Sequence, residues 1–170
     1  MTKETLRIDS NRQLFVDDYM IESMDQVELE LHTPRGAGTA LVLDQAWEGV
    51  TCDYQTVFQD DDTYRMYYRG SSHEGYTIES LLEDGEQIVP LHHETICYAE
   101  SKDGINWSKP DLGLIEFNGS KKNSIVWLDD DLDTTDLVPF IDGNPESKSE
   151  ERYKGIVRKG SNVFAVSSPD

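Results

Sequence analysis

Asp and Glu account for 34 of the 170 residues, and one run of them has the spacing of a calcium-binding loop. Residues 129–136 read DDDLDTTD, so the aspartates at 129, 131 and 133 take positions one, three and five of an EF-hand loop. The sixth position is then Thr134, where the loop needs glycine, and the twelfth is Phe140, where it needs a bidentate glutamate. The run is therefore interpreted as a solvated acidic loop that attracts cations without a dedicated site.

Other metal-ligating or nucleophilic side chains also fail to complete a site. His92, His93 and Glu94 are consecutive, but no further ligand follows at a recognisable spacing, so they are interpreted as a surface loop with Glu94 at the start of a strand. Cys52 and Cys97 are too few for a disulfide framework and are expected to be buried thiols. The sequence contains no phosphate-binding glycine loop and no Ser-His-Asp order, and neither a cofactor nor a metal is expected.

An acidic pair, Asp17 and Asp18, interrupts the apolar stretch LFVDDYMI at 14–21. Burying a carboxylate is costly unless it is paired or hydrogen-bonded. Two interpretations stay open: the pair serves a functional site, or one carboxylate is solvated and the other caps the backbone of an edge strand.

The formal net charge of −19 restricts the partners of the chain. Nucleic acids and anionic membranes are bound by Lys and Arg that neutralise phosphates, so neither is an expected partner. Neutral sugars and polyols remain as ligands. No apolar run approaches the roughly 20 residues that span a bilayer, and the N-terminus lacks the apolar core of a secretory signal. A cytoplasmic location is expected unless a leader has been removed.

The elements that would position these side chains are strands. TVFQ at 56–59 and YRMYYRG at 64–70 are rich in β-branched and aromatic residues, and the acidic turn DDDT between them predicts a β-hairpin. TICYAES at 95–101 predicts another strand; near the N-terminus, the stretch 14–21 is strand-like and the stretch 27–31 alternates between apolar and acidic residues. Only residues 80–84 could form a helical turn. The chain is therefore predicted to be all-β.

The strand pattern occurs twice. YRMYYRG at 64–70 aligns with YKGIVRKG at 153–160, and TICYAESKD at 95–103 aligns with NVFAVSSPD at 162–170. The two alignments differ in offset because a polar stretch follows the first YRMYYRG, and an insertion in a repeated unit belongs in a loop. Repeated units of several antiparallel strands at this length are typical of β-propeller blades.

The motif SKDGINW at 101–107 closes the first copy. Asp-Gly favours a tight turn with Gly104 at positive φ, and Trp107 is expected to pack between sheets rather than to stack on a ligand. The second copy contains only the Ser-x-Asp part of the motif, at 168–170.

Six strings carry a resemblance to known proteins: RQLFVDDYMI (12–21), WEG (47–49), YQTVFQDDDTYRMYYRG (54–70), TICYAESKDGINWSKPDLGLIEFNGSKKNSIV (95–126), PFIDGNP (139–145) and ERYKGIV (151–157). They resemble a bacterial group of uncharacterised proteins assigned to the five-bladed propeller superfamily of invertases, levansucrases and arabinanases. The resemblance implies an N-terminal fragment covering about the first two blades of such a propeller. Residues 1–37 would supply N-terminal strands, 38–110 the first blade, and 111–170 an incomplete second blade.

This resemblance implies a glycoside hydrolase that acts on a carbohydrate through carboxylates in the propeller channel. The superfamily uses a base or nucleophile in the first blade, a stabilising aspartate in the second and a glutamic acid in the third. Asp53 matches the first position, with Tyr54 where proline is usual and with Asp17 or Asp18 as rivals. Asp142 in PFIDGNP resembles the second. The third-blade glutamate is absent from this sequence, so the chain alone is expected to be inactive.

Four further residues are expected to contact the substrate: Trp47, Tyr54, Arg69 and Glu94. Simpler interpretations stay open, in which the aromatic rings pack in the core or at its rim, Asp53 merely begins a strand, and Asp142 forms an ordinary turn. A non-catalytic carbohydrate-binding or interaction propeller is the alternative function, since propellers host many functions. Exposed blade edges also predict self-association.

Overall fold

The computed structural model describes residues 8, 10, 13–49, 52–71, 73–74, 89–90, 92–128, 137–159 and 161–170. Its contacts divide the chain into two compact units, residues 1–36 and 37–170. No α-helix occurs among the described residues, and the fold is all-β, as predicted. Within the described ranges, nothing helical has the length and apolar character that a bilayer crossing requires.

The described part of the first unit contains no strand, so the prediction of strands over 14–21 and 27–31 is wrong. The alternating apolar side chains there remain exposed, with Leu31 97% and Val16 82% accessible. A strand is stable only when a neighbour satisfies its backbone groups and covers one face, and none of the strands in the described ranges pairs with this segment.

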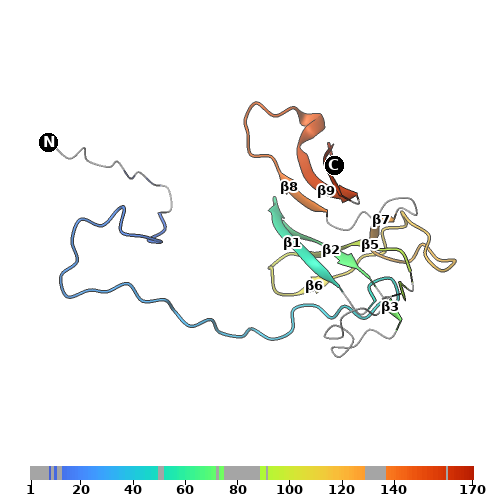
Figure 1. Ribbon diagram of the computed structural model, residues 1–170, viewed down its shortest axis with the longest axis horizontal. Helices are drawn as coiled ribbons and strands as arrows, with labels where there is room; N and C mark the ends of the chain where they lie inside the picture. Colours follow the sequence, from blue (N-terminus) through green and yellow to red (C-terminus); the bar gives the residue numbers. More distant parts are fainter. Residues whose placement is uncertain are drawn as a thin grey trace. The chain divides into compact units, whose positions relative to one another are not determined.

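The first sheet of the second unit is antiparallel and has the order β1-β2-β5-β6, with β7 also paired to β5 (Figure 1). Its strands are β1 (Asp53–Asp60), β2 (Thr63–Gly70), β5 (Thr95–Ser101), β6 (Trp107–Ser108) and β7 (Ile125–Leu128). The predicted hairpin is confirmed as β1–β2, in which Asp60 lies opposite Thr63 and Asp61 takes a φ of +51° in the turn. Gly104 has the predicted positive φ, +73°, in the turn between β5 and β6.

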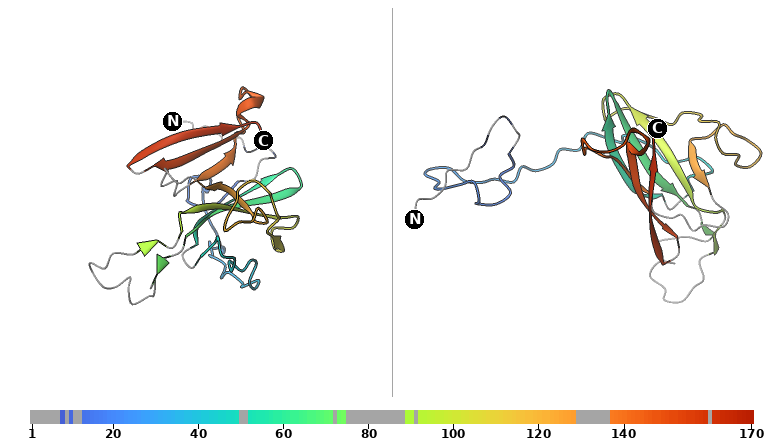
Figure 2. Two further views of the ribbon diagram at one scale, coloured as in Figure 1. Left: turned by 90° about the vertical axis from the view of Figure 1, so that its right-hand side faces the viewer. Right: turned by 90° about the horizontal axis from the view of Figure 1, so that it is seen from above.

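The second sheet contains β8 (Val138–Ile141), β9 (Tyr153–Lys159) and β10 (Asn162–Ser168) in the order β10-β9-β8. A short 3-10 turn, η1 (Ser149–Glu151), precedes β9, and β3 (His73–Glu74) pairs with β4 (Val89–Pro90) in a separate small sheet. The two larger sheets form separate layers (Figure 2). Because β7 pairs with β5, residues 125–128 belong to the first sheet, whereas the sequence-based boundary at 110 assigned them to the second blade.

The two copies of the strand pattern take up equivalent places in the two sheets. Tyr64 lies opposite Ser101 in the β2–β5 pair, and Tyr153 lies opposite Ser168 in the β9–β10 pair, as the alignment of the two copies requires. The hydroxyl of Ser101 accepts a hydrogen bond from the Asp103 amide at 3.2 Å, and Ser168 accepts one from the Asp170 amide at 3.4 Å. Strands β1, β2 and β5 therefore correspond to β8, β9 and β10.

The core lies on one face of the first sheet, where Tyr68, Cys97 and Ala99 are buried. Five partly buried hydrophobic residues pack against them: Leu41, Leu43, Trp47, Met66 and Trp107. Glu48 is fully buried beside this cluster, and it accepts a hydrogen bond from the Tyr68 hydroxyl and binds the Lys109 ammonium at 2.9 Å. These bonds satisfy a charge that would otherwise be costly to bury, and they fix the segment around residues 41–48 to the sheet.

Candidate functional site

Four of the predicted site residues meet around one guanidinium group. Asp53 lies opposite Arg69 in the β1–β2 pair, and its Oδ2 atom accepts a hydrogen bond from Arg69 at 2.7 Å. A second nitrogen of Arg69 lies 3.4 Å from Oε1 of Glu94, which directly precedes β5. The same guanidinium lies 4.6 Å from the ring centre of Tyr54. We call Asp53, Tyr54, Arg69 and Glu94 the Arg69 cluster.

An irregular backbone places the first two members of the cluster. The strand register shifts between Asp53 and Thr56, which marks a β-bulge, and Tyr54 has a φ of +54°. This left-handed conformation costs a residue other than glycine about 1–2 kcal/mol. Bulges re-aim side chains and recur next to active sites. The bulge turns the Tyr54 ring onto Arg69. Because an ordinary strand would not need this costly conformation, the contact with Arg69 is the feature that the bulge provides.

The Arg69 cluster is half-open to solvent. The side chain of Arg69 is 15% exposed, that of Glu94 is 21% exposed and that of Asp53 is 47% exposed. Two carboxylates share one guanidinium, so the cluster carries a net negative charge with charge-assisted hydrogen bonds at its centre. Oδ1 of Asp53 is buried and has no hydrogen-bond partner among the described residues. A buried polar atom without a hydrogen-bond partner costs about 1–3 kcal/mol.

Trp47, the other aromatic residue predicted at the substrate site, lies elsewhere. Its side chain packs against the core cluster on the face of the first sheet that Tyr68 occupies, and Arg69, the next residue of β2, points to the opposite face. Its carbonyl oxygen accepts a hydrogen bond from Thr95 Oγ1 at 2.8 Å. Trp47 therefore packs against the core, which was the simpler of the two interpretations of this residue.

Asp142 does not occupy the position that corresponds to Asp53. It directly follows β8, whereas Asp53 begins β1, so the two carboxylates belong to opposite ends of equivalent strands. Oδ2 of Asp142 binds the Lys154 ammonium at 2.6 Å and Oδ1 accepts the Asn144 amide at 2.9 Å. These two partners, with Lys154 the larger influence, lower the pKa of Asp142 to about 2. Asp53 and Asp142 therefore do not occupy equivalent positions in the two sheets.

Asp17 and Asp18 belong to the first unit and are both exposed. Oδ1 of Asp17 accepts a hydrogen bond from the Tyr19 amide at 3.0 Å, and the Asp18 carbonyl accepts one from the Ile21 amide at 3.0 Å. Neither carboxylate loses its hydration, because the pair lies in a local turn and not inside a strand. The interpretation as solvated and backbone-capping carboxylates fits these contacts.

Asp60 is an important carboxylate that the sequence reasoning missed. It is 5% exposed and accepts hydrogen bonds from Arg65 at 2.8 Å, Arg152 at 2.7 Å and the Tyr153 hydroxyl at 2.7 Å. The Tyr153 hydrogen bond, and then that of Arg65, hold the pKa of Asp60 below its ordinary value. Its position at the start of the acidic string DDD (60–62) suggested a solvated side chain in a turn. The available signal was the pattern Phe-x-Asp, which occurs at 58–60 and 140–142 and also, outside the two sheets, at 15–17.

No group of three metal-ligating side chains is assembled in the part of the chain that the structure describes. Nδ1 of His92 lies 2.7 Å from the His93 carbonyl oxygen, and its ring meets Phe117 edge-on, as in a local loop contact. The acidic run at 129–136 and the helical turn considered at 80–84 lie outside the described residues. Comparison of the chain with protein-family models, with curated proteins and with solved structures finds no match.

Proposed function

We propose that the Arg69 cluster binds a neutral carbohydrate. The observation that carries this proposal is the convergence of Asp53, Glu94 and the Tyr54 ring on one guanidinium, in a cluster whose side chains are partly exposed to solvent. Adjacent sugar hydroxyls both donate and accept hydrogen bonds, so they match a carboxylate next to an arginine. The half-exposed ring of Tyr54 offers an apolar surface for the sugar ring.

The charges of the cluster favour an uncharged ligand. Arg69 is already balanced by two carboxylates, so an anionic sugar would meet net repulsion, and the formal charge of −19 on the whole chain adds to it. The bulge at Asp53 and Tyr54 holds both groups in place before binding, which reduces the entropy lost on complex formation.

We further propose that the two larger sheets are blades of a five-bladed propeller of the invertase, levansucrase and arabinanase type. The equivalent registers of β2–β5 and β9–β10 support a repeated blade. In a glycoside hydrolase of this kind Asp53 would act as base or nucleophile, at the start of an innermost strand. Hydrolysis also needs a second carboxyl group that stays protonated, which in that superfamily is a glutamic acid of the third blade.

A non-catalytic carbohydrate-binding propeller is the second candidate, and one observation favours it. Asp53 and Glu94 are both bound to Arg69, and Asp142, with its pKa of about 2, is bound to Lys154. None of these three is arranged to donate a proton to a leaving group. This chain therefore supports binding more directly than it supports catalysis.

The experiment that tests binding titrates the chain with neutral fructo-oligosaccharides and arabino-oligosaccharides, and follows amide signals by NMR. We expect saturable shifts that Arg69→Ala weakens at least tenfold. Asp62→Asn is the matched control. Asp62 lies in the turn of the β1–β2 hairpin, its side chain is 85% exposed, and it is paired with Lys102. Binding that survives Arg69→Ala would place the site elsewhere. If neither sugar class produces saturable shifts, the proposal is wrong.

A further inference from the structure

Two adjacent backbone carbonyl groups, those of Trp47 and Glu48, connect the strand ends that carry the Arg69 cluster. The Glu48 carbonyl oxygen accepts hydrogen bonds from the Ser71 amide at 2.7 Å and from the Cys52 thiol at 2.9 Å. The Trp47 carbonyl oxygen accepts one from Thr95 Oγ1 at 2.8 Å. These three partners lie just before β1, just after β2 and at the start of β5, so two neighbouring residues are bonded to three separate strand ends.

Each of these bonds lies next to a charged member of the cluster. The thiol belongs to the residue before Asp53, the amide to the second residue after Arg69, and the hydroxyl to the residue after Glu94. Because a strand advances only about 3.3 Å per residue, the positions of the two carbonyl oxygens fix the spacing of all three charged groups.

The side chain of Glu48 holds this backbone in place. It is fully buried, and its Oε1 atom accepts a hydrogen bond from the Tyr68 hydroxyl at 2.5 Å. Its Oε2 atom accepts bonds from the Gln45 amide at 2.8 Å and from the Lys109 ammonium at 2.9 Å. Tyr68 belongs to β2 and Lys109 follows β6 closely, so one carboxylate ties the turn at 45–48 to the sheet. Charge-assisted hydrogen bonds of this kind are roughly twice as strong as neutral ones.

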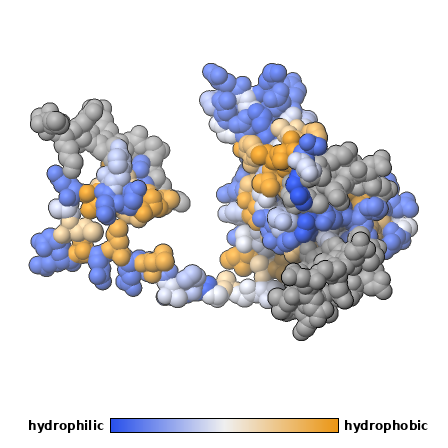
Figure 3. Space-filling model, viewed as in Figure 1, coloured by the Kyte–Doolittle hydropathy of each residue, from blue (hydrophilic) through white to orange (hydrophobic). Residues whose placement is uncertain are grey.

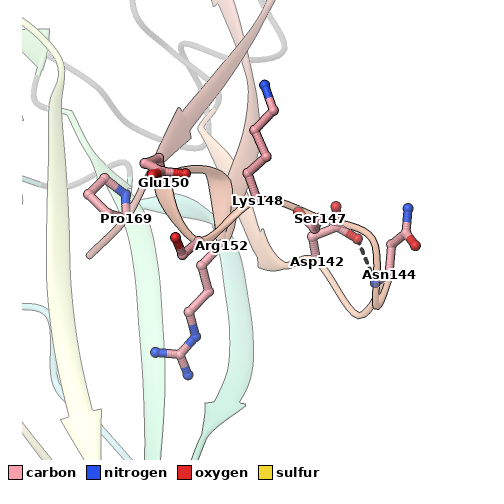
Figure 4. A pocket seen from close by; sticks show the side chains of 8 residues that line it. Asp142, Asn144, Ser147, Lys148, Glu150, Arg152 and Pro169 are labelled. Atoms are coloured by element: carbon pink, nitrogen blue, oxygen red, sulfur yellow. Dashed lines mark hydrogen bonds between the residues drawn. The ribbon is translucent and has the colours of Figure 1, made fainter.

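Strand pairing alone does not require such a segment. The β9–β10 pair has a register equivalent to that of β2–β5, although no segment of the described chain covers the hydrophobic side chains that gather over β8 and β9 (Figure 3). Asp142, which binds Lys154 in that sheet, borders an open hollow of about 440 Å³. Figure 4 shows its carboxylate bonded to Asn144 of the same loop. That ion pair is oriented by local contacts, whereas the ion pairs of Arg69 are supported by a buried segment on the opposite face of their sheet.

We propose that Glu48 is the positioning residue of the Arg69 cluster. Its buried carboxylate holds the backbone of Trp47 and Glu48, and this backbone sets the distances among the charged groups that would bind the sugar hydroxyls. A site that is fixed before binding loses less entropy when its ligand arrives. The inference rests on the carbohydrate-binding function proposed above and deepens it, but the positioning itself is measurable without a sugar.

The test follows the side-chain NMR signal of Arg69 in the full chain, which Arg69→Ala identifies by its loss. The Tyr54 ring, 4.6 Å away, shifts this signal from its position in free arginine, and the two carboxylates slow the exchange of its protons with water. Glu48→Gln keeps the size of the side chain but removes its charge and one of its two acceptor oxygens. We expect this variant to move the signal toward that of free arginine, to speed proton exchange about fivefold or more, and to weaken oligosaccharide binding by a similar factor.

Asp60→Asn is the matched control for stability. It removes another buried charge, at the end of β1 opposite to Asp53, and should leave the Arg69 signal unchanged in the folded protein. Thr95→Val is a milder variant that decides the question if Glu48→Gln does not fold. It removes the bond to the Trp47 carbonyl and should shift the signal in the same direction by a smaller amount. Thr63→Val, the same change at the start of β2, should not.

The outcomes separate the positioning role from sugar binding. An Arg69 signal that is unchanged in Glu48→Gln and Thr95→Val would overturn the positioning role, even if the wild-type chain bound sugar. An equal change in Asp60→Asn would also overturn it, because Glu48 would then act through general stability. A signal that changes as expected in a chain that binds no sugar would support the positioning role and reject the carbohydrate-binding function.

Discussion

Asp60 ends β1, Asp142 directly follows the equivalent strand β8, and both bind equivalent basic residues, but among the described residues only Asp60 also binds side chains of another sheet. Removal of the Asp60 charge leaves Arg65 and Arg152 without their anion between the sheets. We expect Asp60→Asn to lower the free energy of unfolding by about 2–3 kcal/mol, less than a fully buried pair because both arginines are partly exposed. Asp142→Asn should cost clearly less. Urea unfolding measures both, and equal losses would contradict the assignment.

The depressed pKa of Asp60 also predicts how stability depends on pH. A carboxyl group whose folded pKa lies below its unfolded value of about 3.9 stabilises the fold above that value, and this stabilisation is lost as pH falls through the folded pKa. We expect the stability difference between the wild type and Asp60→Asn to be constant above about pH 5 and to shrink below about pH 4. Unfolding curves at a series of pH values check this, and a difference that grows on acidification would refute it.

Tyr54 combines a positive φ with a ring stacked on Arg69. Tyr54→Gly removes a conformational cost of about 1–2 kcal/mol and a cation–π contact of about 0.5–1 kcal/mol, so stability should change little. Binding of the oligosaccharides should nevertheless weaken several-fold. Asp61→Gly is the control at another positive φ, +51°, and it should leave binding unchanged. If both variants bind sugar as the wild type does, Tyr54 is not a ligand contact.

Gly70 ends β2 where another segment crosses it closely. A Cβ atom at this position would lie 2.5 Å from the Trp47 carbonyl oxygen and would also clash with Thr95. Because the obstacle includes backbone, we expect Gly70→Ala to destabilise the fold by about 3 kcal/mol or more. Gly143→Ala meets nothing within 4 Å and should be nearly neutral. Thermal unfolding compares the two, and a neutral Gly70→Ala would mean that the segment around Trp47 is not held against β2.

Both cysteines should be slow to react in the folded protein. Burial is the main cause that raises the pKa of Cys97 to about 12 and that of Cys52 to about 11, so little thiolate exists at neutral pH. We expect labelling by a disulfide reagent at pH 8 only after unfolding in urea. Rapid reaction of Cys97 in the native state would contradict the packing of the core, and rapid reaction of Cys52 would contradict the packing around it.

The hairpin and the repeated register were predictable because local patterns determine them. Alternation in YRMYYRG and the acidic turn before it define β1–β2, and the match of Tyr64 with Tyr153 survives in the pairing of the strands. The stretch at 27–31 alternates equally well, yet it forms no strand, because alternation does not supply a pairing partner. The boundary between the sheets depends on β7 pairing with β5, a contact between distant residues that no local pattern records.

The candidate site was predictable in part for the same reason. Asp53 and Arg69 are register partners in a hairpin, so their contact follows from the hairpin itself. The burial of Asp60 depends on Arg152 and Tyr153, about 90 positions later in the chain. Its role could be seen only after the Phe-x-Asp strings at 58–60 and 140–142 had been recognised as the same position of a repeat.

The segment at 41–48 makes the two outer sides of the sheets different. Leu41, Leu43 and Trp47 occupy one side of the first sheet, and the bonds of Glu48 to Tyr68 and Lys109 hold that side closed. The opposite end of the stack, at Phe140 and Ile156, has no such cover among the described residues. The two sides of the sheets therefore differ in kind, because one is sealed by a segment that precedes the sheets in the chain and the other leaves hydrophobic side chains in contact with solvent.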